Sequence, residues 1–97
     1  MSSRNSKTQK IRVEIFSKRD CHLCDIAKAT LVKVQEEIPF ELQIIDITGD
    51  RELFSEYKEQ IPVIFINGSK SFKYRVDENE LRKRLVRLAP AAGFPHR

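Results

Sequence analysis

The chain has 97 residues, of which 40% are hydrophobic and 33% are charged, with a formal net charge of +4. This length fits one domain, and the composition is that of a globular protein rather than a disordered one. The longest apolar run, residues 63–66, is far shorter than the ~18 residues of a membrane-spanning helix, so we expect no membrane partner. Residues 1–10 are polar throughout and lack the apolar stretch of a signal peptide, which favours a cytoplasmic protein.

The first predicted elements are a strand and a helix. Residues 11–15 alternate between apolar and polar side chains, which is the period of a strand, and residues 17–20 follow as a loop. From His22 onward the apolar residues recur at the spacing of a helix instead, and Pro39 ends this helix. The predicted apolar stripe of the helix comprises Leu23, Ile26, Ala27, Thr30, Leu31, Val34 and Ile38.

A second strand is predicted over residues 40–47. Its apolar positions change phase after Ile44, which favours a strand that is covered on both faces near its end. Asp50 follows the strand and is predicted to be the N-cap of a short helix.

The last elements are a hairpin and a helix. Pro62 opens a third strand at 63–66, and the tight-turn pair Asn67–Gly68 leads into a fourth strand at 71–75. Asp77 is predicted to cap a final helix, which Pro90 ends. The apolar face of this helix comprises Leu81, Leu85 and Leu88.

This order of elements, βαβαββα, predicts an α/β domain over residues 10–89. A helix between two strands gives a parallel crossover, whereas the hairpin requires an antiparallel pair. We therefore expect a four-stranded mixed sheet with helices on both faces. Residues 1–9 are expected to be disordered, and residues 90–97 are expected to form a flexible tail.

The two cysteines of the chain, Cys21 and Cys24, lie where the first predicted helix begins. Their spacing places both thiols at one helix end, one turn apart. Free backbone N–H groups and the positive end of the helix dipole favour a thiolate there. In a reducing compartment, two cysteines are more often catalytic or metal-binding than structural. The pair is therefore suited to thiol–disulfide exchange.

Other interpretations of these residues stay open. The cysteines could be an inert buried pair, or half of a zinc site, for which only His22 and His96 remain as further ligands. We expect no metal site. The basic cluster at 82–87 is interpreted as the solvated face of the last helix, because no aromatic residues are interleaved with it, and we expect no nucleic-acid partner.

Taken together, these features resemble the glutaredoxin branch of the thioredoxin fold over roughly residues 11–88. The pieces that match are the end of the first strand at 16–18, the pair Cys21 and Cys24, Ile61–Pro62 in place of the family's cis-proline, and the hairpin. The resemblance implies that Cys21 attacks a substrate sulfur and that Cys24 then resolves the mixed disulfide. An iron–sulfur cluster shared between two chains, as some glutaredoxins hold, is an open alternative.

Further residues are predicted to bind substrate or to tune the nucleophile. Lys18 stands where glutaredoxins carry a lysine, and a cation there favours a thiolate at Cys21; the alternative is an ordinary loop lysine. His22 stands where glutaredoxins have a proline; it can charge near neutral pH and stabilise the same thiolate, or it is an exposed ring without influence. A cis bond before Pro62 would turn the N–H and C=O of Ile61 toward an extended substrate, whereas a trans proline would only start a strand.

The chain departs from the family before its last predicted helix. Typical glutaredoxins have a Gly-Gly pair and an acid there, which bind glutathione, whereas this chain reads Tyr74-Arg75-Val76-Asp77-Glu78. The two acids would repel the γ-glutamyl carboxylate of glutathione. We therefore expect no bound cofactor, and glutathione is only a candidate reductant.

These observations predict a monomeric thiol–disulfide oxidoreductase that takes part in cell redox homeostasis. Its expected substrate is a protein disulfide or a glutathione mixed disulfide. The alternative is a non-catalytic thioredoxin-fold module that binds partners, senses redox state, or holds a metal or an iron–sulfur cluster.

Overall fold

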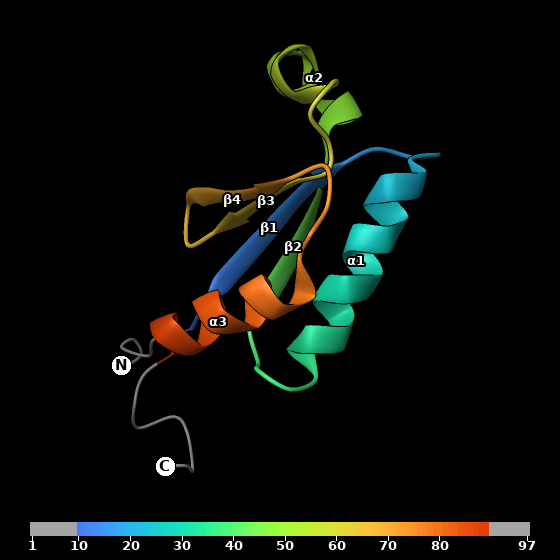
Figure 1. The fold of residues 1–97 in the computed structure, drawn as a ribbon. Helices are drawn as coiled ribbons and strands as arrows, with labels where there is room; N and C mark the ends of the chain where they lie inside the picture. The colour runs from blue at the N-terminus through green and yellow to red at the C-terminus, as the bar shows by residue number, and fades with distance from the viewer. Residues whose placement is uncertain (1–9, 90–97) are drawn as a thin grey trace.

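A computed structural model describes residues 10–89 and has the predicted order of elements (Figure 1). The predicted disordered segment 1–9 and the predicted tail 90–97 lie outside the described residues. The elements are β1 (Arg12–Ser17), α1 (His22–Gln35), β2 (Glu41–Asp46), the short 3₁₀ helix η2 (Ile47–Gly49), α2 (Arg51–Tyr57), β3 (Val63–Ile66), β4 (Ser69–Lys73) and α3 (Glu78–Leu88).

The strands form one mixed sheet in the order β2-β1-β3-β4. β1 pairs parallel with β2, so that Val13 lies opposite Leu42, and antiparallel with β3, so that Val13 also lies opposite Ile66. β3 and β4 pair antiparallel through the predicted hairpin, whose turn residues Asn67 and Gly68 have φ angles of 50° and 86°. The predicted thioredoxin-like α/β fold is confirmed.

The helices form two unequal layers on this sheet. α1 and α3 lie side by side on one face, and the main hydrophobic core is packed between them and the central strands (Figure 1). α2 lies near the end of the sheet at which α1 begins (Figure 1). Tyr57 of α2 packs edge-on against Phe16 and Phe65, which point to the face opposite α1 because successive strand residues alternate. The main core comprises Ile11, Val13, Ile15, Ala27, Leu31, Val34, Ile38, Phe40, Ile64, Ile66, Leu81 and Leu85.

Side-chain caps start the helices as predicted. The carboxylate of Asp50 accepts hydrogen bonds from the N–H groups of Glu52 and Leu53, at 2.9 and 3.1 Å. The carboxylate of Asp77 accepts one from the N–H of Glu80 at 2.9 Å. These caps satisfy N–H groups that have no partner inside the first helical turn.

Two expectations about buried faces are wrong. Leu23 and Ile26 were expected on the apolar stripe of α1, but they are 45% and 50% exposed. Ala27, Leu31 and Val34 of the predicted stripe are buried, and Cys24, which was not part of it, is buried with them. β2 was expected to be covered on both faces near its end, but Ile44 is 53% exposed. The reason is that β2 is an outer strand, while the core residues of α1 pack with the side chains of β1 and β3.

Some element boundaries also differ from the predictions. β1 includes Ser17, which was expected in a loop, and β4 spans Ser69–Lys73 rather than 71–75. α1 ends at Gln35, before the predicted stop at Pro39. None of the helices in residues 10–89 has the length and apolar character needed to cross a membrane.

Candidate active site

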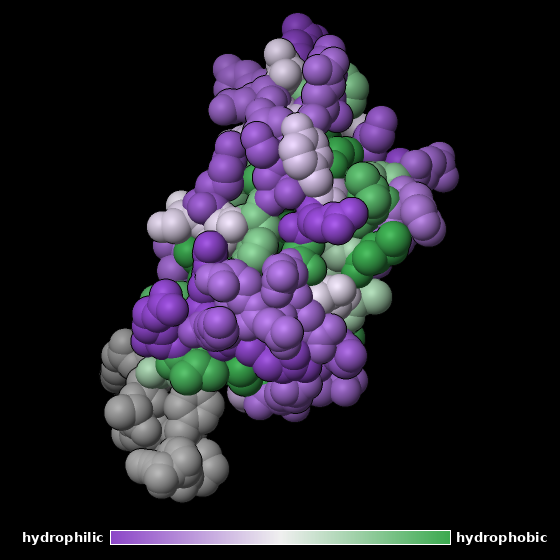
Figure 2. Space-filling view, in the orientation of Figure 1, coloured by the Kyte–Doolittle hydropathy of each residue, from purple (hydrophilic) through white to green (hydrophobic). Residues whose placement is uncertain are grey.

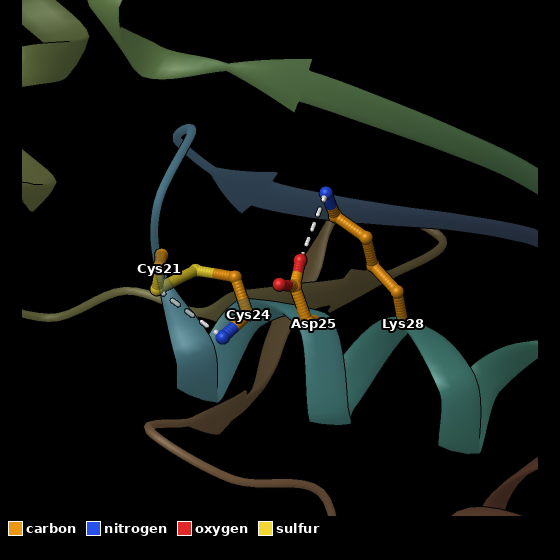
Figure 3. The surroundings of a disulfide bond; sticks show 4 residues. All are labelled: Cys21, Cys24, Asp25 and Lys28. Carbon is orange, nitrogen blue, oxygen red and sulfur yellow. Dashed lines mark hydrogen bonds and ion pairs between the residues drawn. A yellow bond between two sulfur atoms is a disulfide. The ribbon is translucent and has the colours of Figure 1, made fainter.

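Cys21 and Cys24 lie at the N-terminal end of α1, where they form a disulfide with Cα atoms 5.2 Å apart (Figure 3). Cys21 is the N-cap of the helix. Its Sγ accepts a hydrogen bond from the N–H of Cys24 at 3.2 Å, and its carbonyl oxygen accepts one from the N–H of Asp25 at 3.1 Å. The predicted placement of both sulfur atoms at one helix end is confirmed.

The turn from β1 into α1 depends on Asp20. Its φ angle is 58°, in the left-handed region that most side chains avoid and that aspartate tolerates. This residue reverses the chain immediately before the cap, so that Cys21 can adopt the extended backbone of an N-cap. The local sequence thereby sets the position of the sulfur.

The two cysteines differ in exposure. Cys21 is partly exposed, whereas Cys24 is 0% exposed and packs in a second hydrophobic cluster with Ile47, Ile61 and Val63. A thiol without access to solvent cannot meet an incoming disulfide. Cys21 is therefore the sulfur that a substrate can reach, and Cys24 is the sulfur that can follow it.

The segment at Ile61–Pro62 lies beside this pair. Its peptide bond is cis, as predicted, and Ile61 belongs to the same cluster as both cysteines. The N–H of Tyr74 donates to the carbonyl of Pro62 at 2.8 Å. The prediction that the N–H of Ile61 is free to meet a substrate is wrong, because this group donates to the carbonyl of Tyr57 at 3.2 Å. Of the two backbone groups of Ile61, the carbonyl is therefore the one that can pair with a substrate, because the N–H would first have to leave Tyr57.

The other two predicted site residues lie at the ends of adjacent elements. Lys18 directly follows β1 and is partly buried, and His22 is the exposed first residue of α1. Neither side chain forms an ion pair or a hydrogen bond with another described residue. Their effect on Cys21 stays a prediction.

In this part of the molecule, Asp25 and Asp46 each have a neighbouring partner, and Tyr57 is partly buried. Asp25 lies 4.0 Å from the Nζ atom of Lys28, one turn along α1 (Figure 3). Hydrogen bonds from Thr48 hold the pKa of Asp46 below its usual value, and the charges of Arg19 and Lys28 add to this effect. Burial of the Tyr57 ring raises the pKa of its hydroxyl, which therefore stays protonated at neutral pH.

No three His, Cys, Asp or Glu side chains in residues 10–89 lie together as metal ligands would. His96, which was considered as a zinc ligand, lies outside the described residues. The described part of the chain therefore offers no complete zinc ligand set, and the iron–sulfur cluster shared between two chains stays an open alternative.

Sequence reasoning missed a hollow of about 220 Å³ beside the dithiol. Leu23 and Ile26 of α1 form one wall, and Tyr74, Arg75 and Val76 form the other. In Figure 2, hydrophobic side chains gather over the N-terminal half of α1, next to the loop between β4 and α3. One feature of the sequence could have indicated the hollow: the loop before the last helix lacks the Gly-Gly pair of typical glutaredoxins.

Comparison with known proteins agrees with this geometry. Residues 12–86 match the family described as Glutaredoxin-like domain (DUF836). The "Glutaredoxin-like protein YDR286C homolog" of Dictyostelium discoideum is 32% identical over 77 residues, which cover 73% of this chain and 71% of that protein.

Solved structures point to the same fold. The solution structure of protein Ne2328 from Nitrosomonas europaea has a TM-score of 0.69 and 25% identity, and the match covers 84% of this chain and 98% of that chain. Fasciola hepatica thioredoxin has a TM-score of 0.58 and 21% identity, with 84% and 83% covered, and shares the fold. With its matching family, its cis-proline and its cysteine pair at a helix N-terminus, the chain belongs to the glutaredoxin-like domains (DUF836) of the thioredoxin superfamily.

Proposed function

We propose that this protein is a dithiol oxidoreductase that reduces disulfides. The observation that carries this proposal is the unequal exposure of the cysteines: Cys21 is reachable and caps α1, and Cys24 lies buried behind it. One sulfur that meets the substrate and a second sulfur within bonding reach of the first are what dithiol exchange requires.

The proposed reaction begins with the reduced protein. The Cys21 thiolate, stabilised by the N–H of Cys24 and by the helix N-terminus, attacks one sulfur of the substrate disulfide. A mixed disulfide forms, and the other substrate sulfur leaves as a thiolate that takes up a proton.

Cys24 completes the exchange. Its thiolate attacks the Sγ of Cys21, which breaks the mixed disulfide and releases the second substrate thiol. The substrate gains two electrons, and the protein is left with the Cys21–Cys24 disulfide, the state that the structure contains. A thiol reductant then restores the dithiol, for which glutathione is the candidate.

The proposal also assigns roles to residues around the cysteine pair. Lys18 and His22 are proposed to favour the Cys21 thiolate, and the carbonyl of Ile61 is proposed to pair with the substrate backbone. The substrate is a protein disulfide or a glutathione mixed disulfide. We propose that the protein acts as a monomer in the cytoplasm, because a reductase of cell redox homeostasis needs a compartment that keeps thiols reduced.

Two serine variants test the assignment. Cys21→Ser should lose the reduction of a small model disulfide, whereas Cys24→Ser should accumulate a mixed disulfide with the substrate, which mass spectrometry detects. Alkylation of Cys21 in the Cys24→Ser variant should reach its plateau rate at a lower pH than alkylation of free cysteine.

The outcome that contradicts the proposal is equally specific. If Cys21→Ser reduces the model disulfide as fast as the parent, Cys21 is not the nucleophile. If the parent shows no turnover and Cys21 alkylates like a free thiol, the chain is a non-catalytic thioredoxin-fold module instead.

A further inference from the structure

The hollow beside the dithiol has a strongly apolar wall. Three large side chains that border it are unusually exposed: Leu23 at 45%, Ile26 at 50% and Tyr74 at 44%. Apolar side chains that gather in one exposed place mark interaction sites in folded proteins. Leu23 stands between the two cysteines in the sequence, so the hollow borders the helix end that carries them, although neither cysteine lines it.

The far wall of the hollow is fixed to the active site. Tyr74 has a φ angle of 76°, which is rare for an aromatic residue, and the hydrogen bond from its N–H to the carbonyl of Pro62 holds this conformation. Backbone conformations of this kind persist where surrounding contacts hold them, and they cluster at ligand sites. The wall at Tyr74 is therefore tied by a hydrogen bond to the cis-proline, which lies in a different segment before β3.

The size of the hollow favours one side chain over a whole small molecule. Its volume of about 220 Å³ is below the roughly 300–1,000 Å³ of pockets that enclose drug-sized ligands. A γ-glutamyl carboxylate placed against Leu23 and Ile26 would lose water without gaining a partner from that wall. An apolar side chain has no hydrogen bonds to water that it would have to give up in this hollow.

Arg75 is the only charged residue among those that line the hollow. It forms no ion pair with another described residue. Lys70 and Lys73 of β4 do not line the hollow and lie opposite Phe65 and Val63 in the hairpin. The acids that follow are already engaged: Asp77 caps α3, and Glu78 pairs with Arg82 and Lys33. A partner that carries acids beside its apolar side chain would complement this surface.

We propose that the hollow binds an apolar side chain of an acidic polypeptide, whose neighbouring disulfide Cys21 then reduces. This inference rests on the proposed function and names its substrate class. Arg75 contributes selectivity for acidic residues, and Ile26 contributes the apolar contact.

Three short peptides test this inference. Each carries one cysteine in a mixed disulfide with thionitrobenzoate, whose release is coloured. The first has a phenylalanine near the cysteine and acidic flanks, the second has the same phenylalanine and basic flanks, and the third has acidic flanks and serine in place of phenylalanine. The parent should reduce the first peptide about tenfold faster than either of the others, measured as kcat/KM.

Matched variants separate the local surface from the overall charge. Arg75→Glu should reverse the preference between acidic and basic peptides, whereas Lys83→Glu, which changes the net charge equally on the exposed side of α3, should leave it unchanged. Ile26→Gln should remove most of the preference for phenylalanine. Val86→Gln is its control, because Val86 on α3 is 52% exposed and Ile26 is 50% exposed.

The outcomes distinguish this inference from the proposed function. If the parent reduces a small hydroxyethyl disulfide and treats all three peptides alike, or if Lys83→Glu acts like Arg75→Glu, the inference is wrong and the proposed function stands. If the parent reduces no disulfide, the proposed function fails. Fluorescence anisotropy of the acidic peptide with serine in place of its cysteine then decides the docking alone: binding that Arg75→Glu abolishes supports it, and no binding overturns it.

Discussion

Cys21 serves at once as a helix cap and as the reachable sulfur of the site. Its Sγ occupies the position that a serine hydroxyl takes in ordinary N-caps, and the N–H of Cys24 donates to it. A serine at this position therefore keeps the cap while removing the thiol. For this reason a loss of activity in Cys21→Ser would report on chemistry rather than on unfolding.

Neighbouring residues of α1 should contribute very differently to the free energy of unfolding. Leu31 is 0% exposed in the main core, so Leu31→Ala should lower the free energy of unfolding by about 2–5 kcal/mol. Val32 is 46% exposed, and Val32→Ala should change it by no more than about 0.5 kcal/mol. Urea denaturation of both variants checks this contrast, and equal losses would mean that α1 does not dock as described.

Residues of the site differ in how far the sequence predicted them. The cis bond at Ile61–Pro62 followed from the resemblance to glutaredoxins, and the placement of Cys21 and Cys24 followed from their spacing. The position of Tyr74 in the wall of the hollow could not be predicted. Its backbone has a positive φ and donates a hydrogen bond to Pro62, which is distant in sequence. No local pattern encodes such a contact.

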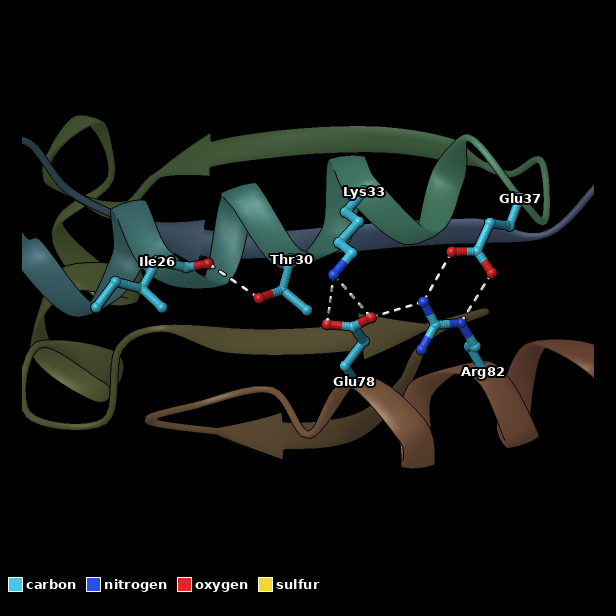
Figure 4. A network of polar contacts seen from close by, with 6 residues as sticks. All are labelled: Ile26, Thr30, Lys33, Glu37, Glu78 and Arg82. Carbon is cyan, nitrogen blue, oxygen red and sulfur yellow. Dashed lines mark hydrogen bonds and ion pairs between the residues drawn. The ribbon is translucent and has the colours of Figure 1, made fainter.

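At the scale of elements, α1 and α3 are joined by a network of ion pairs (Figure 4). Arg82 of α3 donates two hydrogen bonds to Glu37, just after α1, at 2.9 and 2.7 Å, and a third to Glu78 at 2.6 Å. Lys33 of α1 lies 3.3 Å from Glu78. One arginine thus links both helices through two carboxylates that share its guanidinium.

Removing Arg82 should change how stability depends on pH. The hydrogen bonds from Arg82 lower the pKa of Glu37 and of Glu78 below their ordinary value of 4.5, and Lys33 adds to this shift at Glu78. A lowered pKa contributes stability above the unfolded-state value, and this contribution is lost as the pH falls through the folded-state value. Arg82→Met should therefore be less stable than the parent at neutral pH, with a gap that closes in acid.

Thermal melts at several pH values measure that gap. Arg87→Met is the control, because Arg87 lies exposed on the same helix and forms no ion pair with another residue in 10–89. A gap between Arg82→Met and the parent that stays constant into acid would show that Glu37 and Glu78 do not stabilise the folded state through their charges.

Element order was predictable because its signals are local. The caps Asp50 and Asp77 and the turn pair Asn67–Gly68 act on residues within a few positions of themselves. The exposure of Ile44 was not predictable in this way, because it depends on which strand lies at the edge of the sheet. Periodicity identifies an apolar strand but does not say what covers it.

The whole molecule places its chemistry at one end of a sheet whose stability is concentrated in the middle. β1 and β3 are the central strands, and their core side chains are at most 4% exposed. β2 and β4 are the outer strands. Cys21 follows β1, and the cis-proline precedes β3, so both are anchored to the two central strands. The hollow lies instead against the loop that follows the outer strand β4.

This division predicts the pattern of amide hydrogen exchange. The amides of Val13, Ile15 and Ile64 should exchange most slowly, because opening them requires unfolding of the core shared by the sheet, α1 and α3. Amides of β2 and β4 should exchange faster, since alternate N–H groups of an outer strand have no neighbouring strand within the described sheet. Exchange followed by nuclear magnetic resonance measures each amide separately. If β2 is protected as strongly as β1, something covers that edge in solution, and a second copy of the chain is then the first partner to test by sedimentation.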